Sequence, residues 1–128
     1  MNLLLDTQAF LWLDGDQGKI SAIAREACSN LGNILWLSVA SAWEIQIKSG
    51  LGKLRLARPL DLIIAEQQSA NGIQVLAIQL SHVIALNGMP PHHRDPFDRL
   101  LIAQAKSEGW QIVTKDPQFK AYDVPVIW

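Results

Sequence analysis

Residues 2–6 read "NLLLD", a short apolar run that ends in an acid. A continuous apolar run of this length is typical of a strand that is buried on both faces of a parallel sheet. Four further runs have the same character: "NILWLS" (33–38), "IQVLAI" (73–78), "WQIVTKD" (110–116) and "VPVIW" (124–128). The sequence therefore predicts a sheet of four or five strands, with residues 124–128 as the fifth.

Segments with helical spacing lie between these predicted strands. The residues from Thr7 onward predict a short helical turn that ends at the break "DGD" (14–16). Further helices are expected at 21–30, 39–50, 58–72, 81–88 and 96–105, of which 81–88 is short. Ser21 is in position to cap the first of these helices and Gly72 to end the third. The alternation of strands and helices predicts βα units and a mainly parallel sheet with right-handed crossovers.

The composition fits one domain that spans residues 1–128. Hydrophobic residues make up 49% of the chain, which is enough for a substantial core. The formal net charge of −1 excludes a general polyanion binder, so any contact with nucleic acid requires a local basic patch. The single cysteine, Cys28, excludes an intramolecular disulfide and fits a reducing cytosol. Because no apolar run approaches the length of a membrane span, we expect a soluble, cytoplasmic protein.

Four acids stand where the predicted fold can bring them together. Asp6 and Asp116 follow the ends of strands, and ligands of open α/β sheets bind at the carboxyl ends of the strands. Glu44 and Asp98 lie near the starts of two helices. Asp98 also lies on the apolar stripe of its helix, three or four residues before the next buried positions. Burying a carboxylate without a partner is costly, so this charge needs one.

Each acid also has a simpler structural explanation. Glu44 precedes Lys48 by four residues and can pair with it on a helix surface. Asp98 would occupy the third position of a helix capped by Asp95, where a carboxylate favours the positive helix end. The two acids at strand ends can each cap the next helix or start a turn. These explanations account for the acids singly but not for the place of Asp98 on the apolar stripe.

Together the four carboxylates predict a metal site. Three or four of them in one cleft repel one another and raise one another's pKa values. An all-oxygen set of ligands suits Mg²⁺ or Mn²⁺ rather than zinc. Such a site can activate water for attack on a phosphodiester. A stretch without acids supplies candidate contacts to a nucleic-acid backbone, namely Lys48, Lys53, Arg55 and Arg58.

Four motifs in register resemble the PIN-domain family, and most closely its VapC-type ribonuclease toxins of prokaryotic toxin–antitoxin pairs. They are "LLLDT" (3–7), "SVASAWEI" (38–45), "DPFDRLLIAQA" (95–105) and "IVTKDPQF" (112–119). The resemblance spans nearly the whole chain. It implies a three-layer α/β/α sandwich around a parallel sheet of four or five strands. It also implies Mg²⁺- or Mn²⁺-dependent hydrolysis of RNA.

The resemblance implies roles for particular residues. Those that match the four family acids are Asp6, Glu44, Asp98 and Asp116. The three aspartates would hold one or two metal ions, and Glu44 would either ligate an ion as well or orient the attacking water as a base. Those that match supporting positions are Thr7, Thr114 and Asp95. Two cations that flank the acids are candidates for phosphate contact, Arg99 and Lys115. The implied partners are an RNA substrate, a cognate antitoxin whose tail occludes the cleft, and a second copy of the chain in a homodimer.

Other classes of function fit less well. An aspartyl-phosphate enzyme needs a second acid two residues after the first strand-end acid, where this chain has Gln8. A zinc site made of His82, His92 and His93 is poorly supported, because adjacent histidines point in different directions and a solvated, proline-rich loop explains them. The remaining alternative is a catalytically silent domain that only binds protein or RNA. A complete set of four acids argues against it.

Overall fold

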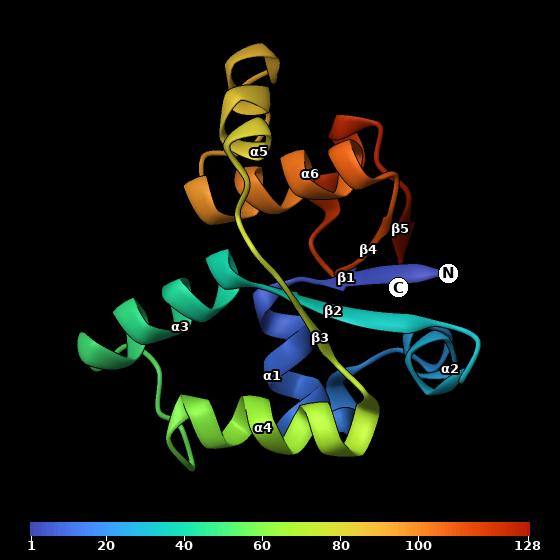
Figure 1. Ribbon diagram of the computed structural model, residues 1–128, viewed down its shortest axis with the longest axis vertical. Helices are drawn as coiled ribbons and strands as arrows, with labels where there is room; N and C mark the ends of the chain where they lie inside the picture. The colour runs from blue at the N-terminus through green and yellow to red at the C-terminus, as the bar shows by residue number, and fades with distance from the viewer.

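The computed structural model describes residues 1–128 as a parallel sheet with helices on both faces (Figure 1). The strands are β1 (Asn2–Leu5), β2 (Ile34–Ser38), β3 (Gln74–Leu76), β4 (Gln111–Val113) and β5 (Val126–Ile127). Their order in the sheet is β3-β2-β1-β4-β5, and every neighbouring pair is parallel. The predicted α/β class, the parallel sheet and the fifth strand are confirmed.

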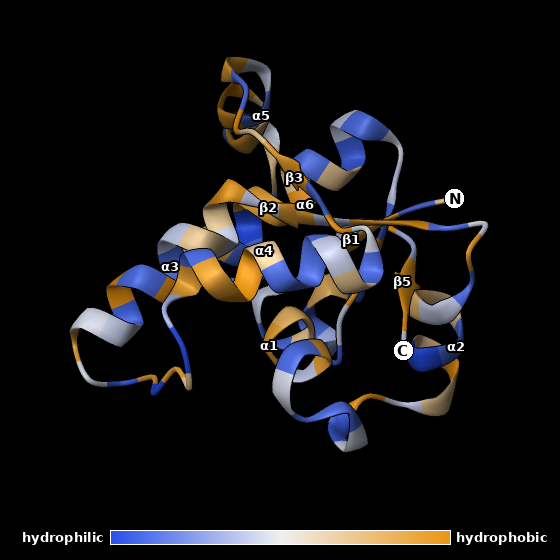
Figure 2. Ribbon diagram, turned by 60° about the horizontal axis from the view of Figure 1, so that its bottom comes forward, coloured by the Kyte–Doolittle hydropathy of each residue, from blue (hydrophilic) through white to orange (hydrophobic).

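Two helical layers enclose the sheet (Figures 1 and 2). One layer holds α1 (Thr7–Gly15), α2 (Ala22–Ser29) and α4 (Leu60–Asn71), and the other holds α6 (Pro96–Glu108) with α5 (Leu80–Ala85) packed beside it. Helix α3 (Val39–Gly50) continues from the carboxyl end of β2 and contacts α1, α4 and α6. Three 3-10 helices complete the chain: η1 (Gln17–Lys19), η2 (Leu86–Gly88) and η3 (Pro117–Tyr122). None of these helices is long and apolar enough to cross a membrane.

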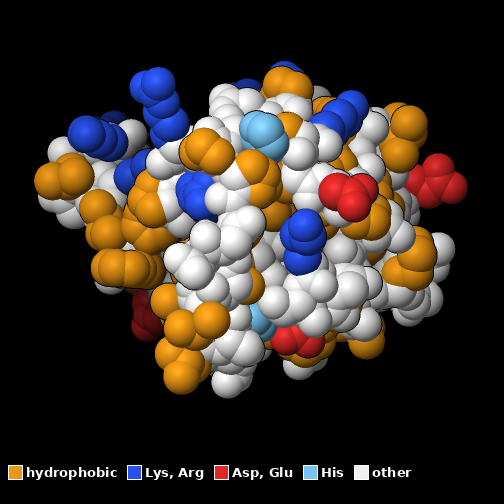
Figure 3. Space-filling model, turned by 90° about the horizontal axis from the view of Figure 1, so that it is seen from above, with side chains coloured by type: hydrophobic (Ala, Val, Ile, Leu, Met, Phe, Trp, Pro, Cys, Tyr) orange, Lys and Arg blue, Asp and Glu red, His pale blue; other side chains and the backbone are white.

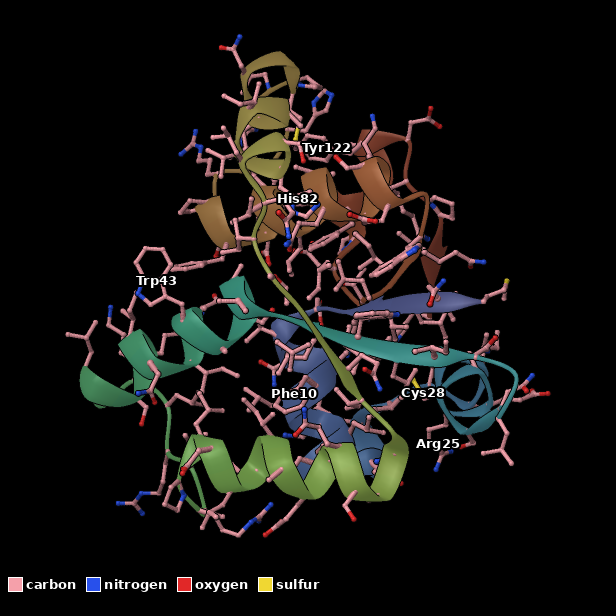
Figure 4. The ribbon with its side chains drawn as sticks, viewed as in Figure 1. Phe10, Arg25, Cys28, Trp43, His82 and Tyr122 are labelled. Carbon is pink, nitrogen blue, oxygen red and sulfur yellow. The ribbon has the colours of Figure 1, made fainter.

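The central strand β1 explains why both layers form. Leu3 and Leu5 pack in one core cluster with Phe10 of α1, which Figure 4 shows beneath the sheet. Leu4 packs in a second cluster with Leu101 of α6. All five side chains are fully buried. Burial on both faces is the reason that this strand is apolar at successive positions instead of at alternate ones.

Most predicted element ends agree with the structure. Ser21 caps α2 through its side chain, and Gly72 ends α4 in the left-handed conformation with φ 64°. The predicted turn after Thr7 is a nine-residue helix, and the predicted helix 81–88 ends at residue 85 before η2. The predicted strand 110–116 ends at residue 113, and the backbone N–H of Asp116 donates to the side chain of Thr114 instead of to a neighbouring strand.

Candidate active site

The carboxyl ends of the strands open into a cleft of about 570 Å³. Its polar lining combines acids from three elements with basic side chains and includes Asp6, Asp98, Asp116, Lys48, Lys53 and Lys115. Glu44 lies next to this lining, since its carboxylate binds Lys48. The four acids predicted from the sequence are therefore brought to one edge of the sheet.

Asp6 serves two purposes at the end of β1. Its Oδ1 accepts the backbone N–H of Ala9 at 2.7 Å, which makes it the predicted cap of α1, and its Oδ2 accepts the hydroxyl of Thr114 at 2.5 Å. The residue is 8% exposed. Burial raises the pKa of Asp6 to about 6; Asp116 and Glu44 act in the same direction, and the two hydrogen bonds oppose them. Asp6 is therefore the cap of α1, but the contacts that it makes do not compensate its negative charge.

Glu44 lies on the face of α3 that turns inward. Its Oε1 accepts the hydroxyl of Thr7 at 2.6 Å, and its Oε2 accepts Nζ of Lys48 at 2.7 Å. Ser41 Oγ lies 3.0 Å from the same threonine hydroxyl. The predicted pair with Lys48 is present, but Glu44 is only 3% exposed, so the pair is not the surface interaction that its spacing indicates. The hydrogen bond that Lys48 donates to Glu44 raises the pKa of Lys48 and holds its positive charge beside the cleft.

Asp98 occupies the first turn of α6, as predicted. Asp95 is the N-cap, and its Oδ1 accepts two backbone N–H groups of that turn, at 2.8 and 3.2 Å. The side chain of Asp98 is 19% exposed. The pKa of Asp98 is raised to about 7, mainly by burial; Asp95, Glu44 and Asp6 act in the same direction, and His93 acts in the opposite direction. A helix N-terminus alone does not compensate this charge.

An aromatic contact joins the two helices that carry these acids. Trp43 of α3 meets Phe97 of α6 edge to face, with ring centroids 5.4 Å apart. Figure 4 shows Trp43 projecting from α3 toward the start of α6. Each ring is the sequence neighbour of an acid, Glu44 or Asp98. The contact therefore joins α3 and α6 at the positions next to the two acids.

Asp116 follows β4 and caps η3. Its Oδ1 accepts the backbone N–H of Gln118 at 2.9 Å, so the predicted Asp-Pro turn is present. The backbone N–H of Asp116 donates to Thr114 Oγ1 at 3.0 Å, and the same hydroxyl donates to Asp6. Thr114 therefore links the acids at the ends of β1 and β4. The other oxygen of Asp116, Oδ2, lies 3.0 Å from Nε2 of His93.

The expectation that the histidines lie in a solvated loop is wrong for two of them. His82 is 1% exposed and contacts Glu108, and His93 is 8% exposed and lies among the acids. Only His92 is exposed. Sequence reasoning missed His93 because the surrounding "MPPHHR" reads as a loop. The sequence does indicate one feature of His93: it lies two residues before the N-cap Asp95. From that position its ring reaches the first turn of α6.

The basic residues proposed for RNA contact divide into two groups. Lys48, Lys53 and Lys115 line the acidic cleft. Arg55 and Arg58 line a separate hollow of about 940 Å³ between α3 and α4 that contains none of the four acids. Several basic side chains gather at the end of the molecule where α3 lies (Figure 3).

Two arginines have structural partners that the sequence did not reveal. Arg58 binds Asp14 at 2.9 Å and Glu66 at 2.8 Å. Arg99 donates to the carbonyl of Pro90 at 2.9 Å and to the hydroxyl of Tyr122 at 3.2 Å, which fixes the loop before α6. Both guanidinium groups form contacts within the fold, and phosphate contact by these two side chains stays a prediction.

The donor set fits a hard divalent cation. The ligand atoms of His93, Asp98 and Asp116 all lie within 4.8 Å of one another. Asp6 and Asp98 both have raised pKa values through burial, and their acidic neighbours add to the effect. A cation among these oxygens would remove that penalty, and carboxylate oxygens are the ligands that Mg²⁺ and Mn²⁺ prefer. The cluster therefore has the chemistry of an oxygen-rich metal site.

Comparison with known proteins places this geometry in a family. Ribonuclease VapC22 from Mycobacterium tuberculosis is 26% identical over 124 residues, which covers 96% of this chain and 93% of that protein. The structure of VapBC2 from Rickettsia felis bound to a promoter DNA fragment has a TM-score of 0.68 at 13% identity and covers 98% of this chain and 97% of its own. DNA-bound VapBC from Salmonella typhimurium has a TM-score of 0.69 at 18% identity and covers 98% and 96%. These two structures share the fold. The PIN-domain family model matches residues 3–125, so the chain belongs to the PIN-domain family.

Proposed function

We propose that this protein is a metal-dependent ribonuclease and the toxin of a toxin–antitoxin pair. The observation that carries the proposal is the convergence of Asp6, Glu44, Asp98 and Asp116 at the acidic cleft, which lysine side chains also line. The likeness to Ribonuclease VapC22 supports RNA as the substrate class.

The side chains at the cleft have different roles in the proposed hydrolysis. Asp6, Asp98 and Asp116 would hold Mg²⁺ or Mn²⁺. When bound, the ion polarises the phosphodiester and lowers the pKa of a water molecule. Glu44 already accepts from Thr7 and Lys48 through both oxygens, so it suits orienting the attacking water or receiving its proton better than direct ligation. Thr7, Thr114 and Asp95 keep the acids in place by hydrogen bonds.

Two protein partners follow from the same proposal. The solved VapBC structures contain toxin and antitoxin together, which supports a cognate antitoxin for this chain. We also infer a homodimer and a cytoplasmic location, as the resemblance implies. An antitoxin tail with a basic side chain would complement the acids of the cleft.

The direct test is cleavage of a labelled, structured RNA by the purified protein. We expect cleavage with Mg²⁺ or Mn²⁺ and none with EDTA, because the acids alone cannot stabilise the charge on a phosphodiester. Cleavage that continues in EDTA would contradict metal dependence. Binding of RNA without cleavage, under every metal tried, would instead support the silent binding module.

The lysines of the cleft should contribute to RNA affinity. The double variant Lys53→Ala/Lys115→Ala is expected to weaken RNA binding and to reduce the slope of log K against log salt by about 2, roughly 1 for each phosphate contact. Lys106→Ala is the matched control, since Lys106 is equally exposed at the far end of α6. Fluorescence anisotropy at several salt concentrations measures the slope. An unchanged slope in the double variant would place the RNA elsewhere.

A further inference from the structure

His93 is held rigidly at the edge of the acidic cluster. Its backbone N–H donates to the hydroxyl of Tyr122 at 2.6 Å, and its ring meets Phe119 edge to face with centroids 5.8 Å apart. Figure 4 shows Tyr122 beside α6, on the side of the sheet that α6 covers. The residue is 8% exposed. The backbone hydrogen bond and the edge-to-face contact together restrict the orientation of the His93 ring.

The two ring nitrogens face different partners. Nδ1 accepts the backbone N–H of Asp95 at 3.1 Å. A backbone amide can only donate, so Nδ1 carries no proton and the proton of the neutral ring lies on Nε2. Nε2 lies 3.0 Å from Oδ2 of Asp116, to which it donates, and 3.1 Å from Oδ2 of Asp98.

The position of the ring proton decides whether His93 binds the metal ion itself or orients the carboxylates that bind it. His93, Asp98 and Asp116 form a group that resembles a three-ligand metal site. A histidine ligand must present an unprotonated nitrogen to the metal, and the second nitrogen then donates to a nearby acceptor. Here the orientation is the reverse, because the nitrogen that faces the cleft is the protonated one.

We propose that His93 is a positioning residue that holds Asp98 of α6 and Asp116 of η3 at metal-binding separation through its Nε2–H, and that it does not itself bind the metal. The other acids have comparable donors: Thr114 and a backbone amide for Asp6, and Thr7 and Lys48 for Glu44. No side-chain hydrogen bond to Asp98 is present, but its Oδ2 lies 3.1 Å from the same Nε2 that donates to Oδ2 of Asp116, so His93 lies between the two carboxylates. The inference rests on the proposed metal site.

Two substitutions separate the ring nitrogens. His93→Asn keeps an acceptor near the position of Nδ1 and loses the donor at Nε2, whereas His93→Gln keeps a donor near the position of Nε2. We expect His93→Asn to weaken Mn²⁺ binding by about 10–100-fold, as loss of an outer partner of a metal ligand typically does. His93→Gln should stay within about threefold of wild type, since the donor that orients the acids is retained.

Mn²⁺ binding is measured by electron paramagnetic resonance of free Mn²⁺ with the full-length protein and no RNA. Thermal unfolding without metal identifies any variant that fails to fold. In RNA cleavage, His93→Asn should regain turnover at high Mn²⁺ with an unchanged KM for RNA, which a merely unfolded protein would not do. Nitrogen-15 NMR of the wild-type ring gives an independent reading, and we expect the Nε2–H tautomer.

Three results would overturn the inference: wild-type Mn²⁺ affinity in His93→Asn, equal losses in the two folded variants, or a proton found on Nδ1. Absence of Mn²⁺ binding by the wild type would also overturn it, since no metal site would then exist to be positioned. Mn²⁺ binding that depends on His93 without RNA cleavage would leave the inference standing and would refute the proposed function instead.

Discussion

Replacement of Asp98 by asparagine is expected to lower RNA cleavage by about 10³-fold while the protein stays folded. A bound metal ion contributes several kcal/mol to the transition state, and the loss of about 4 kcal/mol corresponds to about a thousandfold in rate. Asparagine keeps the size of the side chain but not its charge. Because burial raises the pKa of Asp98 to about 7, the variant also loses an unfavourable buried charge. Metal-free Asp98→Asn should therefore be as stable as wild type or more stable at neutral pH.

The control for this variant is Asp61→Asn. Asp61 is an exposed acid in the first turn of α4 and lies outside the acidic cleft. The Asp61→Asn variant therefore loses one negative charge at a helix start, as Asp98→Asn does. Single-turnover cleavage with Mn²⁺ should be normal for Asp61→Asn and nearly absent for Asp98→Asn. Normal cleavage by Asp98→Asn would mean that Asp98 serves only to favour the N-terminus of α6.

The second large effect is a fall in the stability of the metal-free protein as pH rises. Asp6 and Asp98 have folded-state pKa values of about 6 and about 7, above the ordinary value of 3.8. Between these values the folded protein binds more protons than the unfolded chain, so the free energy of unfolding falls with increasing pH. We expect a fall of about 3 kcal/mol in total between pH of about 4 and about 8, since solvent near Asp98 screens part of the effect.

A divalent ion should reverse this fall. Mn²⁺ binds the ionised carboxylates of the folded state, and a free concentration of about one hundred times Kd adds about 2.7 kcal/mol. Urea unfolding in EDTA and in Mn²⁺, at pH about 5 and about 8, measures both effects. The Asp6→Asn/Asp98→Asn double variant isolates the contribution of these two acids, because every other titrating group is unchanged. A wild-type stability that rises toward pH 8 in EDTA, relative to this variant, would show that the acids are already compensated.

The fold was predictable from the sequence because burial on both faces makes a parallel strand uniformly apolar. "NLLLD" therefore identified β1, and the alternation with helices identified the parallel sheet. Asp6 and Asp116 were predictable as site residues for the same reason, since strand ends share an edge. Asp98 was predictable because a carboxylate on an apolar stripe requires a partner.

Side chains with distant partners could not be predicted. Arg58 meets Asp14 across 44 positions, and Arg99 meets Tyr122 across 23. Local spacing holds no information about such contacts. His93 was missed for the same reason: its contact with Asp116 spans 23 positions, while its local sequence is typical of a loop. The residues that orient an active site are therefore harder to find than the acids that form it.

A Mn²⁺ titration, in which metal occupancy and RNA cleavage are followed on the same samples of wild-type protein, distinguishes a catalytic metal site from an acidic cluster that plays no part in cleavage. Occupancy comes from the resonance signal of free Mn²⁺, and cleavage from a labelled RNA. If the four converging acids form the catalytic metal site, cleavage will rise in proportion to occupancy, from none in EDTA to its maximum at saturation. RNA cleavage that reaches its maximum before any Mn²⁺ is bound would contradict the account.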